Sequence, residues 1–126
     1  MTANQSTIVP LEDSEQATLF EWATYAAGKH PELELLYAIP NGGYRHKRTA
    51  AILKRTGVKA GVPDIHLPVA KGKYHSLYIE MKRRKNSTTT VNQKLWHEAL
   101  KEQGHACHVC KGWEEARDVI LKYLLL

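Results

Sequence analysis

The stretch from Gly61 to Lys82 reads GVPDIHLPVAKGKYHSLYIEMK, and it decides the fold that we expect. Runs at 62–69 and 75–82 are rich in aliphatic and aromatic residues, and the short turn at 71–73 between them carries a glycine. This pattern is typical of two antiparallel strands joined by a tight connection. The stretch therefore predicts a β-hairpin near the middle of the chain.

The second of these strands carries two charged residues on one face. Along SLYIEMK, residues 76–82, apolar residues alternate with the others, and side chains leave a strand on alternate faces. Glu80 and Lys82 therefore share a face. The hairpin can return Asp64, near the start of the first strand, to the side of Glu80. Two carboxylates and one ammonium group would then converge at the strand ends.

Such a group of side chains suits the hydrolysis of a phosphodiester. Hard carboxylate oxygens hold Mg²⁺ or Mn²⁺, and the ion polarises a phosphate and lowers the pKa of a bound water. A nearby lysine can orient or deprotonate that water and offset the charge that builds on the phosphate. The alternative is that Glu80 and Lys82 form an ordinary solvent-facing pair on an edge strand. The short motif alone leaves both interpretations open.

The fuller pattern resembles a known group of nucleases. Pro63-Asp64 and Glu80-Met81-Lys82, placed across a hairpin, resemble the signature of the PD-(D/E)xK superfamily. Within that superfamily the chain resembles the VRR-NUC family more closely, over about 14–124. The motifs that carry this resemblance are GVPD at 61–64, IEMK at 79–82, Gln93, Gly104 and the IPNGG turn at 39–43.

The VRR-NUC resemblance implies a restriction-endonuclease-like core and metal-dependent action on DNA, with Mg²⁺ or Mn²⁺ as the cofactor. Stand-alone members, mostly bacterial or phage-borne, look like homodimers that cut branched DNA such as four-way (Holliday) junctions. Members fused to larger chains act instead as flap nucleases. This chain is similar to the stand-alone type.

The same resemblance implies roles for particular residues. Carried over by position, Asp64, Glu80 and the Met81 carbonyl are metal ligands. Lys82 is the catalytic lysine, and Gln93 lies beside it, where it can position the lysine or the phosphate. A buried glutamine bonded to the backbone is the alternative for Gln93.

Nucleases of this kind usually add a glutamate from the first helix, which we predict at 14–27 with Asp13 as its N-cap. Glu15 shares the inward apolar stripe of this helix, and we favour it as the additional catalytic carboxylate. Glu12 would align with the same stripe only if the helix began before Asp13, and Glu21 faces away. The structural alternative is a first-turn carboxylate that the helix dipole stabilises.

The chain has a formal net charge of +5. Such an excess makes an anionic partner plausible, and nucleic acid is the commonest one. We therefore predict that two basic clusters contact the phosphates of DNA, with a solvated basic face as the alternative. The predicted contact residues are Arg45, Lys47, Arg48, Arg83 and Arg84.

The remaining elements surround the hairpin. Helices are predicted at 14–27, 47–55, 91–103 and 113–124, and strands at 33–39, 62–69, 75–82 and 105–110. The order is roughly α-β-α-β-β-α-β-α. We expect an α/β fold of the restriction-endonuclease-like kind, with a mixed β-sheet flanked by helices.

The chain of 126 residues has the length of one domain. We expect residues 11–126 to form this domain and residues 1–10 to be a loose N-terminal arm. No apolar run approaches the roughly 20 residues that a bilayer demands, and the first ten residues lack the features of a secretory signal. We therefore expect a cytoplasmic protein with no membrane segment.

The sequence contains two cysteines, Cys107 and Cys110. Residues three apart on a strand point to opposite faces, so we interpret both as reduced structural residues. A zinc site or redox chemistry is the alternative, although a zinc site would need a second pair of ligands at suitable spacing.

A homodimer is expected for a second reason. A domain this small carries one active site, whereas resolving a four-way junction requires two incisions, and a two-fold dimer supplies two sites. The apolar end at 123–126 either contributes to such an interface or closes the core of the domain itself.

Other functions remain open at this level. A catalytically silent DNA-binding module could keep the same fold, but the retention of the carboxylates, Lys82 and Gln93 argues against it. A flap or single-strand-end nuclease is an alternative within the same class. A metal-dependent hydrolase of another phosphate ester is more distant, because the basic charge favours a polymer substrate.

Overall fold

Four strands form one mixed β-sheet in the computed structural model, which describes residues 11–40 and 47–126. They are β1 (Tyr37–Ala38), β2 (Ile65–Leu67), β3 (Leu77–Lys82) and β4 (Ala106–Lys111), and this is also their order across the sheet. β2 pairs antiparallel with both β1 and β3, whereas β3 and β4 run parallel. The predicted mixed α/β sheet is confirmed. The predicted N-terminal arm at 1–10 lies outside the described residues.

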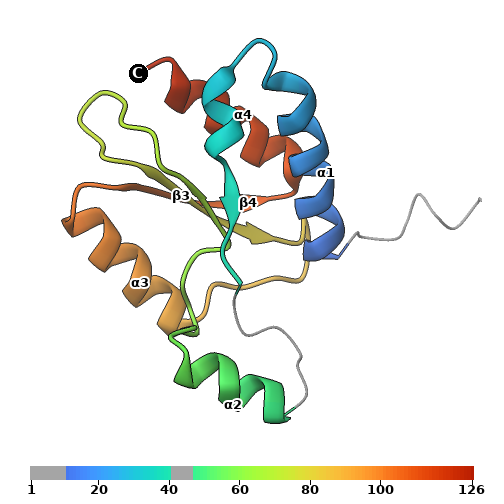
Figure 1. Cartoon of the computed structure of the whole chain (residues 1–126), viewed down its shortest axis with the longest axis vertical. Coiled ribbons are helices and arrows are strands. Elements are labelled where there is room, and N and C mark those ends of the chain that lie inside the picture. Colours follow the sequence, from blue (N-terminus) through green and yellow to red (C-terminus); the bar gives the residue numbers. More distant parts are fainter. Residues whose placement is uncertain (1–10, 41–46) are drawn as a thin grey trace, which may run out of the picture.

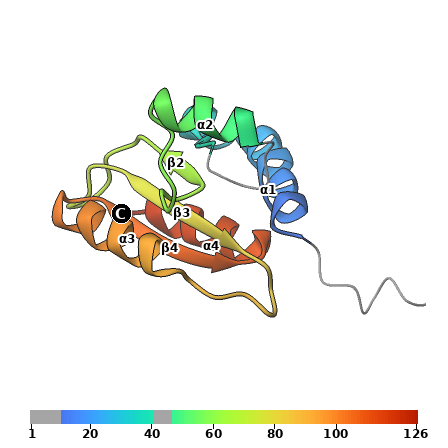
Figure 2. The same ribbon diagram turned by 90° about the horizontal axis from the view of Figure 1, so that it is seen from below.

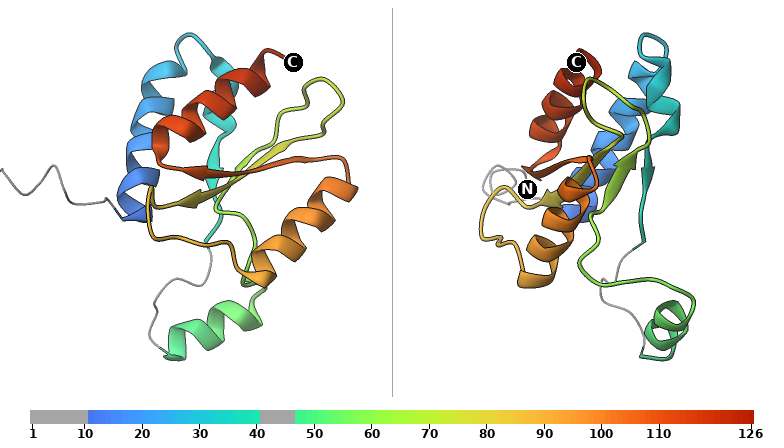
Figure 3. Two further views of the ribbon diagram at one scale, coloured as in Figure 1. Left: turned by 180° about the vertical axis from the view of Figure 1, so that it is seen from behind. Right: turned by 90° about the vertical axis from the view of Figure 1, so that its left-hand side faces the viewer.

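Helices flank this sheet. They are α1 (Glu12–Ala26), the 3-10 helix η2 (Pro31–Leu35), α2 (Lys47–Arg55), α3 (Val91–Glu102) and α4 (Trp113–Leu124). α1 and α4 lie side by side against one face (Figure 1), and α3 runs along β4 (Figure 2). In both views of Figure 3, α2 lies beyond the end of the sheet. No helix of the described ranges is both long and apolar enough to cross a membrane.

The alternation of side chains along β3 separates the core from the charged residues. Leu77, Ile79 and Met81 are fully buried against α1 and α4, where each such side chain contributes about 1.5–3 kcal/mol through burial. Glu80 and Lys82 leave the strand on the opposite face, where side chains of α3 meet them. The core therefore anchors the strand that presents the charged residues.

The predicted hairpin is confirmed, with shorter strands. Ile65 pairs with Ile79 and Leu67 with Leu77, so β2 and β3 are antiparallel. The connection closes through backbone hydrogen bonds in both directions between Lys71 and Tyr74, at 3.1 and 2.9 Å. α2 and α4 coincide with the predicted helices at 47–55 and 113–124.

The predicted strand at 33–39 is wrong over most of its length. Pro31–Leu35 form η2, with the proline in its first turn. Proline fixes φ at a helical value, and the 3-10 turn that follows occupies residues whose apolar character indicates a strand equally well. Only Tyr37–Ala38 pair with β2.

The first helix begins earlier than predicted. Its N-cap is Leu11, whose backbone is extended and whose side chain makes no capping hydrogen bond. The Glu15 N–H donates to the Leu11 carbonyl at 3.1 Å, which places Asp13 inside the first turn. Asp13 is therefore not the N-cap, and Glu12 is a helical residue.

Cys107 and Cys110 are buried free thiols. Burial raises the pKa of Cys107 to about 11 and that of Cys110 to about 12. Thiol redox chemistry requires the thiolate, which these raised pKa values disfavour. The geometry supports a structural role for both residues.

Candidate active site

The hairpin brings Asp64 and Glu80 side by side. Since Ile65 pairs with Ile79, the preceding Asp64 lies opposite Glu80. The Asp64 carboxylate accepts a hydrogen bond from the Met81 backbone N–H at 2.7 Å. This contact continues the hairpin ladder through a side chain and fixes the Asp64 carboxylate next to that of Glu80. The structure thus brings together the two carboxylates that the sequence predicts.

The glycine of the GVPD motif allows a close approach to the start of α3. Gly61 has a φ of +91°, a conformation that side chains other than glycine rarely adopt. A Cβ at this position would lie 2.9 Å from the carbonyl carbon and the Cβ of Asn92. Because no side chain intervenes, the segment that leads to Asp64 and the first turn of α3 border one pocket.

Gln93 connects the two charged residues of β3. Its Oε1 accepts a hydrogen bond from Lys82 Nζ at 2.9 Å, and its Nε2 donates to Glu80 Oε2 at 3.2 Å. The predicted position beside the lysine is therefore the observed one.

A capping box holds Gln93 in this orientation. Thr90 Oγ1 accepts a hydrogen bond from the Gln93 N–H at 3.2 Å, and Gln93 Oε1 accepts one from the Thr90 N–H at 2.9 Å. Such a box normally satisfies free backbone donors at a helix start. In this chain it also directs the amide of Gln93 toward Glu80 and Lys82. Gln93 therefore bonds to the backbone, as the alternative interpretation expects, and contacts both charged residues as well.

Glu80 is a carboxyl group buried in surroundings of like charge. It is only 1% exposed, and its pKa is raised to about 9. Burial is the largest cause, the hydrogen bond and the charge of Asp64 add to the increase, and Lys82 opposes it. Without a cation, Glu80 is therefore protonated at neutral pH. Its Oε1 has no hydrogen-bond partner among the described residues.

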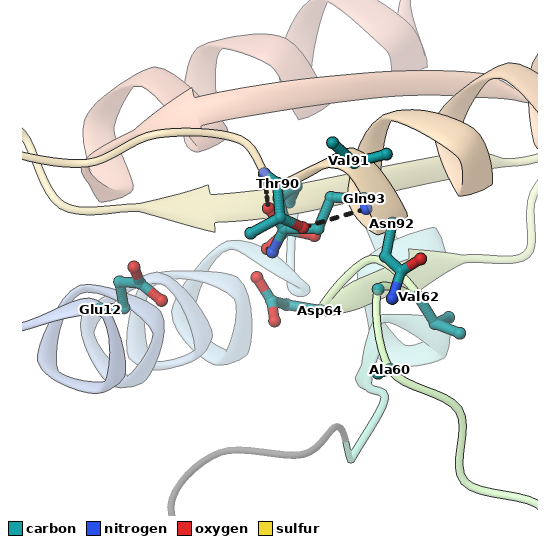
Figure 4. Close-up of a pocket in the computed structure, with 10 residues that line it drawn as sticks. Glu12, Ala60, Val62, Asp64, Thr90, Val91, Asn92 and Gln93 are labelled. Atoms are coloured by element: carbon teal, nitrogen blue, oxygen red, sulfur yellow. Dashed lines mark hydrogen bonds between the residues drawn. The ribbon is translucent and has the colours of Figure 1, made fainter.

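The carboxylate that α1 contributes to this site is Glu12. It lines the pocket with Asp64 and Glu80, and its negative charge adds to the raised pKa of Glu80. Figure 4 shows Glu12 on α1 with its carboxylate toward Asp64. The structure therefore does not support the preference for Glu15, which depended on a helix that starts after Asp13.

Glu15 instead makes a structural contact. This buried carboxylate accepts hydrogen bonds from Arg84 Nε at 2.7 Å and from the Trp113 N–H at 3.2 Å. Arg84 also donates to Glu114 at 2.8 Å, so the group ties α1 to the start of α4. Because the Arg84 guanidinium is committed to two carboxylates, this geometry does not support the expected phosphate contact of Arg84.

The structure describes only part of the other residues predicted to contact phosphates. Arg45 lies outside the described residues, and Lys47 and Arg48 begin α2 with side chains outside them as well. Arg83 directly follows β3 and is partly exposed. Contact of these residues with phosphates stays a prediction.

One pocket of about 630 Å³ borders the carboxyl groups of Glu12, Asp64 and Glu80 (Figure 4). Its lining consists of Glu12, Ala60, Gly61, Val62, Asp64, Glu80 and the first turn of α3 from Thr90 to Gln93. Two adjacent carboxyl groups, one of which retains a proton, and a buried oxygen without a partner fit a hard divalent cation. Across 11–40 and 47–126, no three His, Cys, Asp or Glu side chains are grouped closely enough to hold a metal ion, so such a cation would also need backbone or water ligands.

Two residues at this site are absent from the predictions above. Thr90 stands three residues before Gln93 at the start of a predicted helix, which is the spacing of a capping box. His97 stands four residues after Gln93, on the same face of α3, and its Nε2 lies 3.8 Å from Glu80 Oε1. Both residues could therefore be found in the sequence from their spacing to Gln93.

A mixed sheet whose central hairpin presents two carboxylates to one pocket, with a lysine bound to a glutamine of the pocket wall, defines a restriction-endonuclease-like, nuclease-type domain. The chain matches the VRR-NUC domain family over residues 9–114. A solved structure described as a VRR_NUC domain protein has a TM-score of 0.75 and 32% identity to it, over 93% of this chain and 90% of that one. No curated protein matches the chain. The chain belongs to the VRR-NUC family.

Proposed function

We propose that this protein is a metal-dependent DNA endonuclease that hydrolyses phosphodiester bonds, with Mg²⁺ or Mn²⁺ as the cofactor. The proposal rests on one pocket at which Asp64 lies beside Glu80 and Gln93 holds Lys82. Membership of the VRR-NUC family supports it, because this is a nuclease-type domain for which DNA is the substrate.

Each residue would have a distinct part in the reaction. Asp64, Glu80 and the Met81 carbonyl are the proposed ligands of the cation, which when bound supplies a Lewis acid and lowers the pKa of a water. Lys82 orients or deprotonates the attacking water and offsets the charge that grows on the phosphate. Gln93 keeps the lysine in place for that step. Glu12 adds a negative charge at the mouth of the pocket.

We further propose that the protein acts as a homodimer on branched DNA, such as a four-way junction. Paired incision of like strands requires two sites related by a two-fold axis, and each chain supplies one. Of the apolar residues 123–126, Tyr123 belongs to the core whereas Leu125 is 86% exposed, so the core does not use the whole run. The cytoplasmic location remains a prediction that cell fractionation would test.

A cleavage assay tests the activity. Labelled linear, flap and four-way DNA are incubated with Mg²⁺, Mn²⁺ or EDTA, and we expect cleavage of the four-way substrate only with a metal. Asp64→Asn should abolish cleavage while DNA binding is retained, and Lys82→Ala should lower the rate at unchanged metal affinity. The exposed positions Asp118→Asn and Lys85→Ala are matched controls that should cleave normally.

The possible outcomes separate the parts of the proposal. Normal cleavage by Asp64→Asn would contradict the assigned site, and binding without cleavage under every metal would identify a catalytically silent DNA-binding module. Preference for flap ends would identify a flap nuclease. Sedimentation at micromolar concentration tests the dimer, and a monomer that nicks every DNA equally would contradict the junction-cleaving part alone.

A further inference from the structure

Two buried polar atoms without partners face each other at the site. Glu80 Oε1 and His97 Nε2 are 3.8 Å apart, and neither has a hydrogen-bond partner among the described residues. His97 is 7% exposed and Glu80 is 1% exposed. A buried polar group without a hydrogen bond carries a desolvation penalty. A hydrogen bond between the two atoms when a cation is bound would account for this arrangement.

The helix directs one donor at each oxygen of the same carboxyl group. Gln93 and His97 are four residues apart and therefore share a face of α3. Gln93 Nε2 already donates to Glu80 Oε2 at 3.2 Å. His97 Nε2 is aimed at the other oxygen, and a shift of about 1 Å brings the pair to hydrogen-bonding distance.

At 3.8 Å the present contact is longer than a hydrogen bond. A neutral imidazole donates one hydrogen bond, and with its proton on Nε2 that donor faces Glu80. Each carboxylate oxygen has two lone pairs, so an oxygen that accepts from α3 can still bind a cation.

We propose that His97 is a positioning residue, whose Nε2–H holds Oε1 of Glu80 while Gln93 holds Oε2, so that the carboxylate keeps one orientation toward the divalent cation. This inference rests on the proposed function, since it concerns a residue behind a proposed metal ligand. Donors behind metal ligands orient them, and their loss commonly lowers metal affinity 10–100-fold. A residue that only fills space would affect stability and leave metal affinity unchanged.

Substitutions at His97 separate these roles. His97→Leu keeps a side chain of similar bulk but removes the donor, whereas the amide N–H of His97→Gln can replace Nε2–H. His108→Leu, at an exposed position on β4, is the matched control. Binding of Mn²⁺ to metal-free protein is measured by calorimetry, thermal unfolding is followed with and without Mn²⁺, and the rate of cleavage of the four-way DNA is measured against Mn²⁺ concentration.

We expect the dissociation constant of Mn²⁺ to rise about 10-fold or more in His97→Leu. We expect it to stay within a few-fold of the unmodified protein in His97→Gln and in His108→Leu. Cleavage at saturating Mn²⁺ should recover more fully than cleavage at low Mn²⁺. If His97→Leu does not fold, His97→Asn, whose amide is too short to reach Glu80, replaces it beside His97→Gln.

An unchanged Mn²⁺ affinity in folded His97→Leu, or equal affinities of the Asn and Gln variants, would overturn the role of His97. Cleavage by the unmodified protein in the same series would show that the proposed function still stands. Failure of the unmodified protein both to bind Mn²⁺ and to cleave would overturn the proposed function and this inference with it.

Discussion

Glu15 and Glu80 are equally buried glutamates with different partners. Glu15 accepts hydrogen bonds from Arg84 and from the Trp113 N–H, so its charge is compensated within the fold. Glu80 faces the carboxylate of Asp64, and its pKa is raised to about 9. A buried carboxyl group opposite another one is unfavourable in its charged form until a cation joins it. The first residue is therefore a structural contact, and the second is a candidate ligand.

The raised pKa of Glu80 predicts how stability depends on pH. In EDTA the native state binds the Glu80 proton more tightly than the unfolded state does, since the ordinary value is 4.5 and the native value about 9. The contribution to stability is therefore complete below about pH 4.5 and is lost as pH rises toward 9, with a total on the order of a few kcal/mol. Thermal unfolding between pH 5 and 8.5 measures this loss.

Glu80→Gln is the control for that dependence, because it keeps the shape of the side chain without a titrating group. We expect it to match the unmodified protein at pH 5 and to be more stable at pH 8.5 in EDTA. Superimposable pH profiles of the two proteins would show that Glu80 does not carry the shift.

A matched pair of substitutions distinguishes the roles of Glu12 and Glu15. Glu12→Gln should lower cleavage about 10-fold or more and leave the unfolding free energy nearly unchanged, because the residue borders the pocket at partial exposure. Glu15→Gln should lower the unfolding free energy by about 3 kcal/mol, because it leaves Arg84 without a buried anionic partner. Urea unfolding and the cleavage assay are measured on both variants, and the reverse assignment of effects would restore Glu15 to the active site.

At the scale of secondary structure, α3 supplies the contacts that orient the charged residues of β3. Its capping box sets Gln93 between Glu80 and Lys82, and its next turn places His97 behind Glu80. The parallel pairing of β3 with β4 and the packing of α3 along β4 hold this helix in register with the site. The start of one helix therefore contributes both to local stability and to the candidate active site.

This coupling predicts two effects from one substitution in the capping box. Thr90→Ala should lower the unfolding free energy by about 1 kcal/mol and should also reduce cleavage, since Gln93 loses one of the bonds that orient it. Thr90→Ser keeps the hydroxyl and is the control. Urea unfolding and cleavage rates measure the two effects, and a loss of stability at full activity would separate the capping box from the chemistry.

For the whole molecule, the net charge of +5 favours an anionic partner. Arg84 is bound to Glu15 and Glu114, so it contributes to cohesion between α1 and α4. Arg83, its neighbour on the chain, is the predicted phosphate contact that directly follows β3. Adjacent arginines are thus expected to have different functions.

The dependence of DNA binding on salt tests this difference. The log–log slope should be roughly −0.9 per phosphate contact on duplex DNA. Arg83→Gln should reduce the slope by about 1, whereas Arg84→Gln should leave it unchanged and lower the melting temperature instead. Binding titrations between 50 and 200 mM salt measure both slopes, and equal slopes for the two variants would contradict the assignment.

Much of this architecture can be read from local pattern. The hairpin, α2, α4 and the convergence of Asp64, Glu80 and Lys82 follow from side-chain alternation, turn residues and apolar periodicity. These are properties of residues close together in the chain, so no knowledge of distant contacts is needed. The Thr90 to Gln93 capping box is equally local, and its spacing is visible in the sequence although we did not predict it.

Contacts between distant segments decided the rest. The sequence places Glu12 and Glu15 on one stripe of a helix, but the helix starts at Glu12 without a side-chain cap, and Arg84, 69 residues along the chain, binds Glu15. Apolar residues after Pro31 are compatible with a strand or a 3-10 turn, and only Tyr37–Ala38 find a pairing edge on β2. Periodicity reports which face of an element a side chain occupies. Which charge the side chain meets there depends on the packing of elements far apart in sequence. That packing places Glu12 at the pocket and Glu15 against Arg84.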